Sequence, residues 1–214
     1  MKQKLSVFIL CFAAMVCLLV SQGCGTDVFS DLYVEWDASK GTVSISELAD
    51  GTKKIEKFDL ENRLVQVDYY DAKEALTHFV TYEYDQNNRL ICELKMSADK
   101  TLLSRGEYVY DGKGVCTGKK ILDNNGILNE EEFFLSDGTT DYHCTYTYNE
   151  KGLLIRTDKY KGSGAILMGY TTQEYYETGH IKRVCAYDAA GAFLHGIRYD
   201  ENGLSTSMSQ EDTQ

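Results

Sequence analysis

The 214-residue chain contains no proline and one tryptophan, and its 22 basic residues are outnumbered by 33 acidic ones. The absence of proline suits strands that donate backbone N–H groups to neighbours on both sides. The deficit of lysine and arginine excludes non-specific nucleic-acid binding, which needs clustered basic residues to neutralise phosphates. A convincing helix is also missing. Only residues 71–79 have a helical composition, and we expect an irregular turn or a single helical turn there.

Motifs of catalysis and metal binding are missing as well. The four histidines, His78, His143, His180 and His195, fall at unrelated positions, and the chain has no HExxH, GxSxG or phosphate-binding loop. Loops such as residues 111–114 carry one acid each, whereas calcium needs about six to eight oxygen ligands. We therefore predict no catalytic residue, no metal and no cofactor, and an enzyme is the third of three functional hypotheses.

The first 23 residues have the composition of a secretory signal. Lys2 and Lys4 precede an uncharged apolar run over residues 5–20, and small residues lead to Cys24. The run is short for a spanning helix, which needs about 20 residues. Without residues 1–23 the chain keeps 20 basic and 33 acidic residues, a net charge of −13.

A repeat occupies the rest of the chain, with a turn signal every 10 to 15 residues. An apolar or aromatic residue stands four positions before each turn residue, and an apolar residue, with one polar exception, stands two positions after it. The turn residues are Asn62, Asn88, Lys100, Gly114, Gly126, Gly138, Gly152, Gly164, Gly179, Gly191 and Gly203. The residues four positions earlier are Phe58, Tyr84, Met96, Tyr110, Leu122, Phe134, Tyr148, Tyr160, Tyr175, Tyr187 and Tyr199.

Five turn-forming residues separate the two apolar positions, with Asp or Asn first and Gly or Asn near the end. The apolar residues on either side then face each other across a hairpin, for example Tyr148 and Leu154 or Tyr160 and Ile166. The sequence predicts an all-β fold, a repetitive antiparallel hairpin meander of about 14 short strands. We expect one aromatic stripe on one face. Apolar residues three positions after most turns indicate that the sheet curves, spirals or packs on itself.

Several segments resemble known sequence families. Residues 82–90, 108–114, 146–154, 187–191 and 199–203 resemble the YD repeats of the RHS family, roughly Tyr-x-Tyr-Asp-x-x-Gly-x-Leu, and the likeness extends over about residues 55–205. That resemblance implies long antiparallel sheets that wrap into shells or spirals. Residues 21–24 resemble a bacterial lipoprotein signal, although Ser21 replaces the usual leucine. This second resemblance implies a lipid on Cys24, and the alternative is a secreted protein with a free terminal cysteine.

The domain prediction is a lipoprotein-type signal at 1–23, a β-repeat domain at 24–204 and a polar flexible tail at 205–214. Besides Cys24, the repeat domain contains four cysteines, Cys92, Cys116, Cys144 and Cys185. They either pack as free, buried small hydrophobes or form one or two disulfides. Six aromatic residues lie off the repeat positions and either face a ligand or pack at strand ends: Tyr33, Trp36, Tyr69, Tyr70, Tyr142 and Tyr170.

The leading functional hypothesis is a non-catalytic lipoprotein, exported and lipid-anchored to a membrane of the bacterial cell envelope, that acts as a scaffold or protein-binding module. The alternative is a glycan-binding accessory lipoprotein that uses exposed aromatic rings, so the expected partners are an envelope protein or a glycan. We expect the first strand near residues 28–36 and the last near residues 193–199. One of these sheet edges is then covered by a terminal segment or adds a partner strand.

Overall fold

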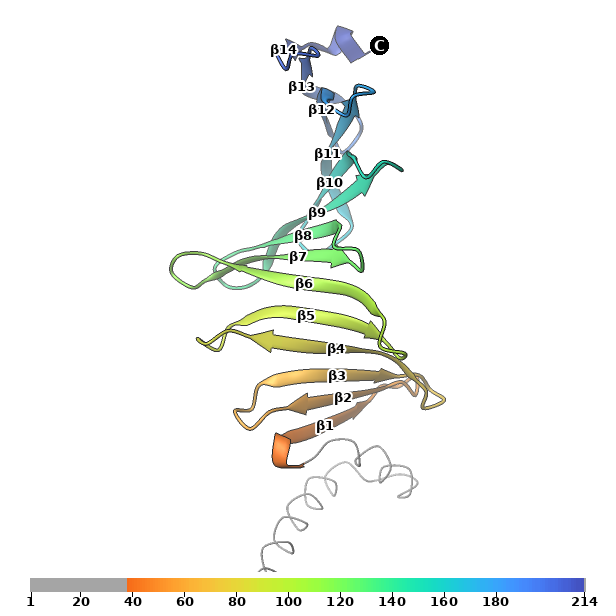
Figure 1. The fold of residues 1–214 in the computed structure, drawn as a ribbon, viewed down its shortest axis with the longest axis vertical. Coiled ribbons are helices and arrows are strands. Elements are labelled where there is room, and N and C mark those ends of the chain that lie inside the picture. Colours follow the sequence, from red (N-terminus) through yellow and green to blue (C-terminus); the bar gives the residue numbers. More distant parts are fainter. Residues whose placement is uncertain (1–37, 214) are drawn as a thin grey trace, which may run out of the picture.

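The computed structural model describes residues 38–213, which form one open antiparallel sheet of 14 strands paired in sequence order (Figure 1). This confirms the predicted all-β meander. Two short 3-10 helices lie outside the strands, η1 (Ala38–Lys40) and η2 (Gln210–Thr213). The strands are β1 (Thr42–Glu47), β2 (Lys53–Phe58), β3 (Leu64–Tyr70), β4 (Leu76–Tyr84), β5 (Leu90–Ser97), β6 (Leu102–Tyr110), β7 (Cys116–Asp123), β8 (Leu128–Phe134), β9 (Thr140–Tyr148), β10 (Leu154–Lys161), β11 (Ile166–Tyr175), β12 (Ile181–Asp188), β13 (Phe193–Tyr199) and β14 (Ser205–Met208).

The five-residue turn predicted from the sequence connects most of the strands. In the β4–β5 turn, Asp85 Oδ1 accepts hydrogen bonds from the backbone N–H groups of Asn87 and Arg89, both at 2.9 Å. Asn88 has a φ of 66°, in the left-handed region that glycine enters without strain. Seven of the expected turn glycines, from Gly114 to Gly203, have a φ between 75° and 87°. The Asp and Gly positions of the repeat are therefore explained by the turn alone.

A β-bulge follows nearly every turn. In β5, Leu90 pairs with Tyr84 and Cys92 pairs with Glu83, so Ile91 has no partner. The same shift occurs in eleven of the thirteen hairpins. In ten of these hairpins the unpaired residue directly follows the first paired residue of the new strand, and in β11 it is Met168, which follows Ile166 and Leu167. Because a bulge bends its strand and increases the local twist, eleven of them twist the whole sheet along its length (Figure 1).

The bulges also decide which side chains share a face. Opposite residues share a face, and side chains alternate along a strand, but the unpaired residue reverses that alternation. Tyr84 and Tyr110 therefore lie on one face, called the first face, whereas Met96 and Leu122 lie on the other, the second face. The predicted single stripe is wrong, because it counted residues along each strand without a bulge. The repeat residues instead alternate between the two faces from hairpin to hairpin.

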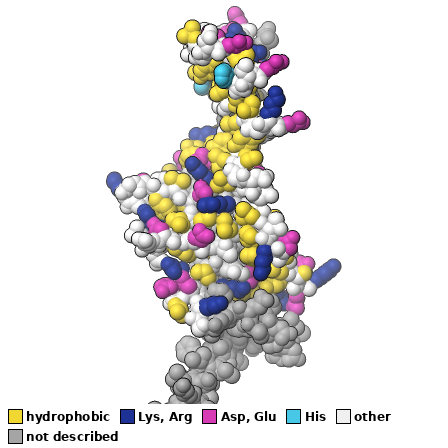
Figure 2. Space-filling view, in the orientation of Figure 1, with side chains coloured by type: hydrophobic (Ala, Val, Ile, Leu, Met, Phe, Trp, Pro, Cys, Tyr) yellow, Lys and Arg dark blue, Asp and Glu magenta, His cyan; other side chains and the backbone are white. Residues whose placement is uncertain are grey.

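The sheet is one layer deep in the described residues. Every strand packs against its sequence neighbours, and η2 adds a contact with β13. Few side chains are fully buried, namely Ile55, Val67, Asp68, Cys92, Asp158, Cys185 and Met208. Hydrophobic side chains accordingly reach the surface along the molecule (Figure 2). The expectation that the sheet packs on itself is wrong, because the apolar residues that suggested it, such as Ile91 and Leu103, are exposed bulge residues.

Tyrosine hydroxyl groups bind the backbone of a neighbouring hairpin whose turn lies at the same end of the strands. Tyr84 donates a hydrogen bond of 2.8 Å to the carbonyl oxygen of Leu64, and Tyr110 donates one of 2.7 Å to that of Leu90. At the opposite end of the strands, Tyr148 donates a hydrogen bond to the carbonyl oxygen of Leu128 at 2.8 Å. The tyrosine of one repeat thus binds the backbone of the repeat two before it, whose turn lies at the same end of the strands, and this explains why tyrosine is preferred over phenylalanine there.

Three local predictions need correction. Tyr160 pairs with Leu167 instead of Ile166, because the left-handed residue of that turn is Gly162, not Gly164. Residues 71–75 form the regular turn, with Glu74 at a φ of 66°. Residues 205–214 are not simply a polar tail: Ser205–Met208 form β14, and the Met208 side chain is buried. The first strand expected near residues 28–36 lies outside the described residues.

Tyr148 tests the register. Its predicted pairing with Leu154 is confirmed, but both side chains are half-buried, since no second layer covers them. We expect Tyr148→Phe to lower the free energy of unfolding by about 1 kcal/mol through the lost hydrogen bond to Leu128. Tyr148→Ala, which also removes ring contacts, should cost about 2–3 kcal/mol. Urea unfolding of each variant measures both costs.

The exposed neighbour supplies the control, because Thr147→Ala should change stability by less than about 0.5 kcal/mol. A Tyr148→Phe protein that unfolds at the wild-type urea concentration would show that the hydroxyl bond contributes nothing.

Candidate binding surfaces

The four candidate aromatic residues within residues 38–213 do not form one platform. Tyr33 and Trp36, like the lipidation candidate Cys24, lie outside the described residues. Tyr69 and Tyr70 are adjacent on β3 and therefore lie on opposite faces. The other two lie far along the sheet, Tyr142 on the second face of β9 and Tyr170 on the first face of β11. A ligand-facing role for these residues stays a prediction.

Neighbouring side chains cover the ring faces of three of these tyrosines. Tyr69 stacks on His78 with ring centroids 4.4 Å apart, and Tyr142 stacks on Phe133 at the same distance. The Lys159 ammonium lies 3.7 Å from the Tyr142 centroid. Sugar recognition by aromatic residues needs an open ring face. The Tyr142 ring has a partner on each neighbouring strand, and His78 covers one ring face of Tyr69.

Tyr170 is enclosed in the same way. Its ring stacks on Tyr187 with centroids 4.9 Å apart, and the Arg156 guanidinium lies 3.8 Å from its centroid. Arg156 also donates to the buried carboxylate of Asp158, with its closest contact at 2.6 Å. This cluster joins β10, β11 and β12 on the first face, and its groups are bound to one another.

Two glutamates form polar networks with tyrosines on the sheet faces. On the first face, the Tyr108 hydroxyl donates to Glu93 at 3.0 Å, and Lys119 forms an ion pair with the same carboxylate. The ion pair joins β5 to β7 across Gly106, where an added Cβ would come within 2.7 Å of both side chains. On the second face, the Tyr146 hydroxyl donates to Glu131 at 2.9 Å.

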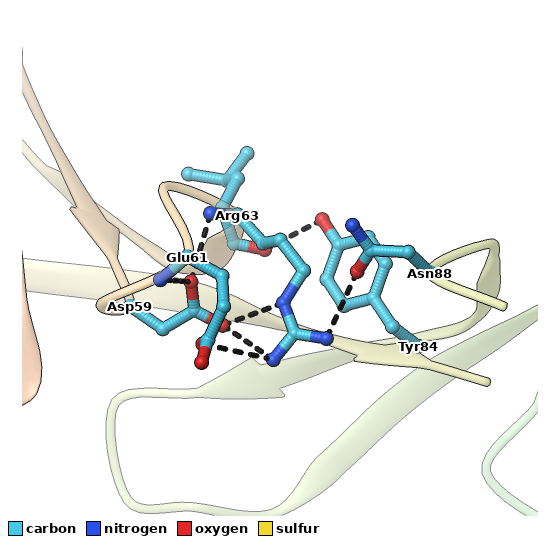
Figure 3. A network of polar contacts seen from close by, with 6 residues as sticks. Asp59, Glu61, Arg63, Tyr84 and Asn88 are labelled. Carbon is cyan, nitrogen blue, oxygen red and sulfur yellow. Dashed lines mark hydrogen bonds and ion pairs between the residues drawn. The ribbon is translucent and has the colours of Figure 1, made fainter. Parts of the chain in front are cut away.

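At one end of the strands, a second network of polar contacts joins two neighbouring turns, β2–β3 and β4–β5 (Figure 3). Arg63 Nε donates to Asp59 within its own turn at 2.7 Å, and Arg63 NH1 donates to Asn88 of the next turn at 3.0 Å. The Arg63 guanidinium also lies 5.3 Å from the Tyr84 ring centroid. Each charged group has a partner inside the network, which therefore holds turns together and offers no free reactive group.

The four cysteines of the described sheet are free thiols. Cys92 and Cys185 are buried, as expected for small hydrophobes, and no two of the four lie on adjacent strands. Burial raises the pKa of Cys92 and Cys144 above the ordinary thiol value. Raised pKa values disfavour the thiolate, so neither group is prepared for nucleophilic chemistry.

Within residues 38–213 no three His, Cys, Asp or Glu side chains are arranged to hold a metal ion. The same residues include no helix with the length and apolarity to cross a membrane. His78 and His143 stack on Tyr69 and Tyr160, and His143 Nδ1 lies 2.7 Å from the carbonyl oxygen of Gly162. These contacts give both rings structural partners. Whether the protein is an enzyme stays a prediction.

The two terminal hairpins differ from the others, which sequence analysis missed. The β1–β2 and β13–β14 pairings contain no bulge, so the end strands are locally regular. Among residues 38–213, nothing pairs with the outer edge of β1 or β14. β14 carries no charged side chain and β1 carries only Glu47. Bulges and charges protect sheet edges from pairing with other chains, and both are scarce here.

Comparisons with known proteins return distant structural neighbours. No family model matches the chain, and no curated protein matches it. The chain is similar to the Tc toxin structure TcdB2-TccC3-TEV (12% identity, TM-score 0.26, covering 75% of this chain and 11% of that one). It is also similar to the Photorhabdus luminescens Tc holotoxin pore (13%, 0.21, 78% and 13%) and to a porin-like protein from Bacteroides uniformis ATCC 8492 (9%, 0.25, 79% and 94%).

This chain thus spans about a tenth of the length of the toxin chains. All these TM-scores lie well below 0.5, so the functional argument depends on the chain's own residues.

Alkaline titration tests the face networks. Burial raises the pKa of Tyr146 above 10, and the hydrogen bond to Glu131 and the charge of Glu131 raise this pKa further. Burial also raises the pKa of Tyr82, to about 12. Since the folded protein holds these protons more tightly, their contribution to stability is complete below about pH 10 and is lost as pH rises through the folded pKa values. We expect Glu131→Gln to lower the pKa of Tyr146.

Phenolate absorbance against pH measures this change. Glu150→Gln, in an exposed turn, should leave the titration unchanged. An identical curve for Glu131→Gln would contradict the network.

Proposed function

We propose that the chain is a non-catalytic scaffold or protein-binding module of the bacterial cell envelope, anchored by a lipid on Cys24. The observation that carries the proposal is the open, one-layer sheet of residues 38–213, in which the outer edges of the nearly uncharged end strands β1 and β14 have no partner. Such edges bind extended segments of other proteins through backbone hydrogen bonds. The signal-like residues 1–24 support export of the chain. The net charge of −11 supports a hydrophilic surface.

The RHS-type YD repeat gives the proposal its architecture. The pattern's tyrosine donates its hydroxyl to a neighbouring hairpin, and its aspartate accepts hydrogen bonds from backbone N–H groups of the turn. The glycine adopts the left-handed conformation of the turn, and the leucine pairs with the tyrosine across the hairpin. These roles build a sheet and leave no residue of the pattern for chemistry.

The glycan-binding alternative lacks comparable support, because Tyr69, Tyr142 and Tyr170 each have a ring face stacked on a neighbouring side chain.

The β14 edge offers backbone groups that a partner can reach. Asp200 N donates to the Leu204 carbonyl oxygen at 3.0 Å, so these two residues form a hydrogen-bonded pair at the end of the ladder. Bonded and non-bonded pairs alternate along antiparallel strands. Thr206 therefore bonds to Arg198 of β13, while the N–H groups of Ser205 and Ser207 point outward.

The anchor is tested by labelling. Expressed in a bacterial host, the unchanged chain should incorporate palmitate and stay with the membrane fraction, because a lipidated terminal cysteine holds it there. Cys24→Ala should lose the label and leave that fraction. Equal labelling of both forms would remove the lipid anchor from the proposal.

Strand addition is tested at β14. In hydrogen exchange of the dilute protein, the Ser205 and Ser207 amides should exchange far faster than those of β6–β10, and a bound partner strand should slow them. Ser207→Pro removes one outward donor and should abolish that slowing with little loss of stability. Thr206→Pro removes a bond to β13 and should melt the terminal hairpin instead.

Uniformly slow exchange along β14 in the dilute protein would show that the edge is already covered, and strand addition would be wrong.

A further inference from the structure

The two faces of the C-terminal strands differ in their charged residues and in how far their apolar side chains are buried. On the first face of β11–β14 lie Glu174, Arg183 and Arg198, together with the buried side chains of Cys185 and Met208. An added Cβ at Gly196, between these two, would lie 3.3 Å from Cys185 Sγ and 3.2 Å from the Phe193 ring. The first face therefore covers its own apolar residues.

The second face of the same strands is almost uncharged. Its paired residues are Ile166, Gly169, Thr171, Gln173, Tyr175, Ile181, Val184, Ala186, Asp188, His195, Ile197, Tyr199, Ser205 and Ser207. Asp188, at one end, is the single Asp, Glu, Lys or Arg among these paired residues, and the bulge residue Lys182 adds one charge near Gln173 and Tyr175 at the other end. In a chain with 33 acidic residues, such a surface is the place where two copies approach with the least repulsion.

This second-face surface also leaves large apolar side chains in water. Ile166 is 68% exposed, Ile181 40% and Ile197 39%. Ile166 begins β11 and Ile181 lies opposite its last residue, so these side chains are spread along the strand. The bulge residues Met168 and Leu194, at 49% and 60% exposed, lie between the two ends. Exposed apolar groups that gather on one surface mark sites of association.

The surface carries a hollow next to its protruding side chains. The hollow extends from β9 to β13 and encloses about 360 Å³ of open space. Its lining includes Cys144 and Thr157 of β9 and β10, the small residues Gly169, Thr171 and Ala186, and the bulge residues Met168 and Leu194. Lys159 also lines it, but its ammonium lies over the Tyr142 ring. A surface with both knob and hollow can pair with itself about a two-fold axis, each copy filling the other.

We propose that the second face of β11–β14 is the contact surface for a second copy of this chain, stacked sheet on sheet in a two-fold dimer. Packed sheets lie about 10 Å apart with their side chains interdigitated. The partner copy then supplies a second layer over Ile166, Met168, Ile181, Leu194 and Ile197, which are exposed in the single chain. The contact uses side chains, so the β14 edge stays available for strand addition.

The size of the surface predicts a weak dimer. Four strands about 4.8 Å apart, each about seven residues long at about 3.4 Å per residue, present roughly 450 Å². Standard complexes bury about 800 Å² per partner. The dimer is therefore concentration-dependent, and a covalent trap in the cell is the suitable probe.

The test places a photo-reactive phenylalanine analogue at position 197 of the full chain in two differently tagged copies. Illumination should give a product of twice the chain mass that carries both tags. Position 127 is the matched control, because Ile127 is 40% exposed against 39% for Ile197 and lies outside the surface. We expect at least about tenfold more dimer product from position 197, equivalent to about 1.4 kcal/mol of selectivity.

A second pair of variants separates the surface from general effects on folding. Leu194→Lys should reduce the product from position 197 about tenfold, because it places a charge in the contact. Leu48→Lys, at the same 60% exposure in the β1–β2 turn, should leave the yield unchanged. Equal dimer yields from positions 197 and 127 would overturn the proposal. Cross-links from position 197 to lipid or to another protein, without the dimer, would overturn it as well.

Discussion

The single unpaired residue after each turn is the constraint from which the rest of the structure follows. It bends the strand and adds twist. It also reverses the alternation of side chains, so that Tyr84 and Met96, at the same repeat position, end on opposite faces. A sheet that places part of its apolar content on each face cannot bury all of it behind one second layer. The open, one-layer architecture therefore follows from the bulge.

Stability in such a sheet comes from neighbours instead of a common core. The Tyr110 hydroxyl binds the Leu90 carbonyl oxygen of a neighbouring hairpin, and Arg89 lies 4.8 Å from the Tyr110 ring centroid. Each hairpin thus depends on those beside it, as in other repeat proteins, whose stability is a sum of unit and interface terms. The end hairpins have a neighbour on one side only. Their regular, nearly uncharged strands are consequently both the least supported part of the sheet and the part most open to a partner.

Turn positions and strand number could be predicted from the sequence because each depends on a local signal, an Asp or Asn followed by a left-handed residue. The face pattern could not, since the spacing from Leu90 to Met96 is even and a bulge leaves no mark in composition. Apolar bulge residues such as Ile91 instead looked like a buried second face. β14 was also missed, because Ser205–Ser207 are polar and the burial of Met208 depends on its pairing with Gly196 of β13. The stacking of Tyr69 on His78 was missed for a similar reason, because it depends on cross-strand register.

Edge and face recognise partners by different means, and this difference decides what each can do. An edge strand offers backbone groups that any extended segment can bind, so selectivity there comes from the few side chains of β14. A face offers a fixed set of side chains, so only a surface of matching shape can fill the hollow between Met168 and Leu194. The hollow's small residues are common strand residues apart from Gly169, where a Cβ would lie 2.6 Å from the Tyr187 carbonyl oxygen. Gly169 is thus required by the close approach of β11 and β12, and the hollow follows from strand packing before any partner is present.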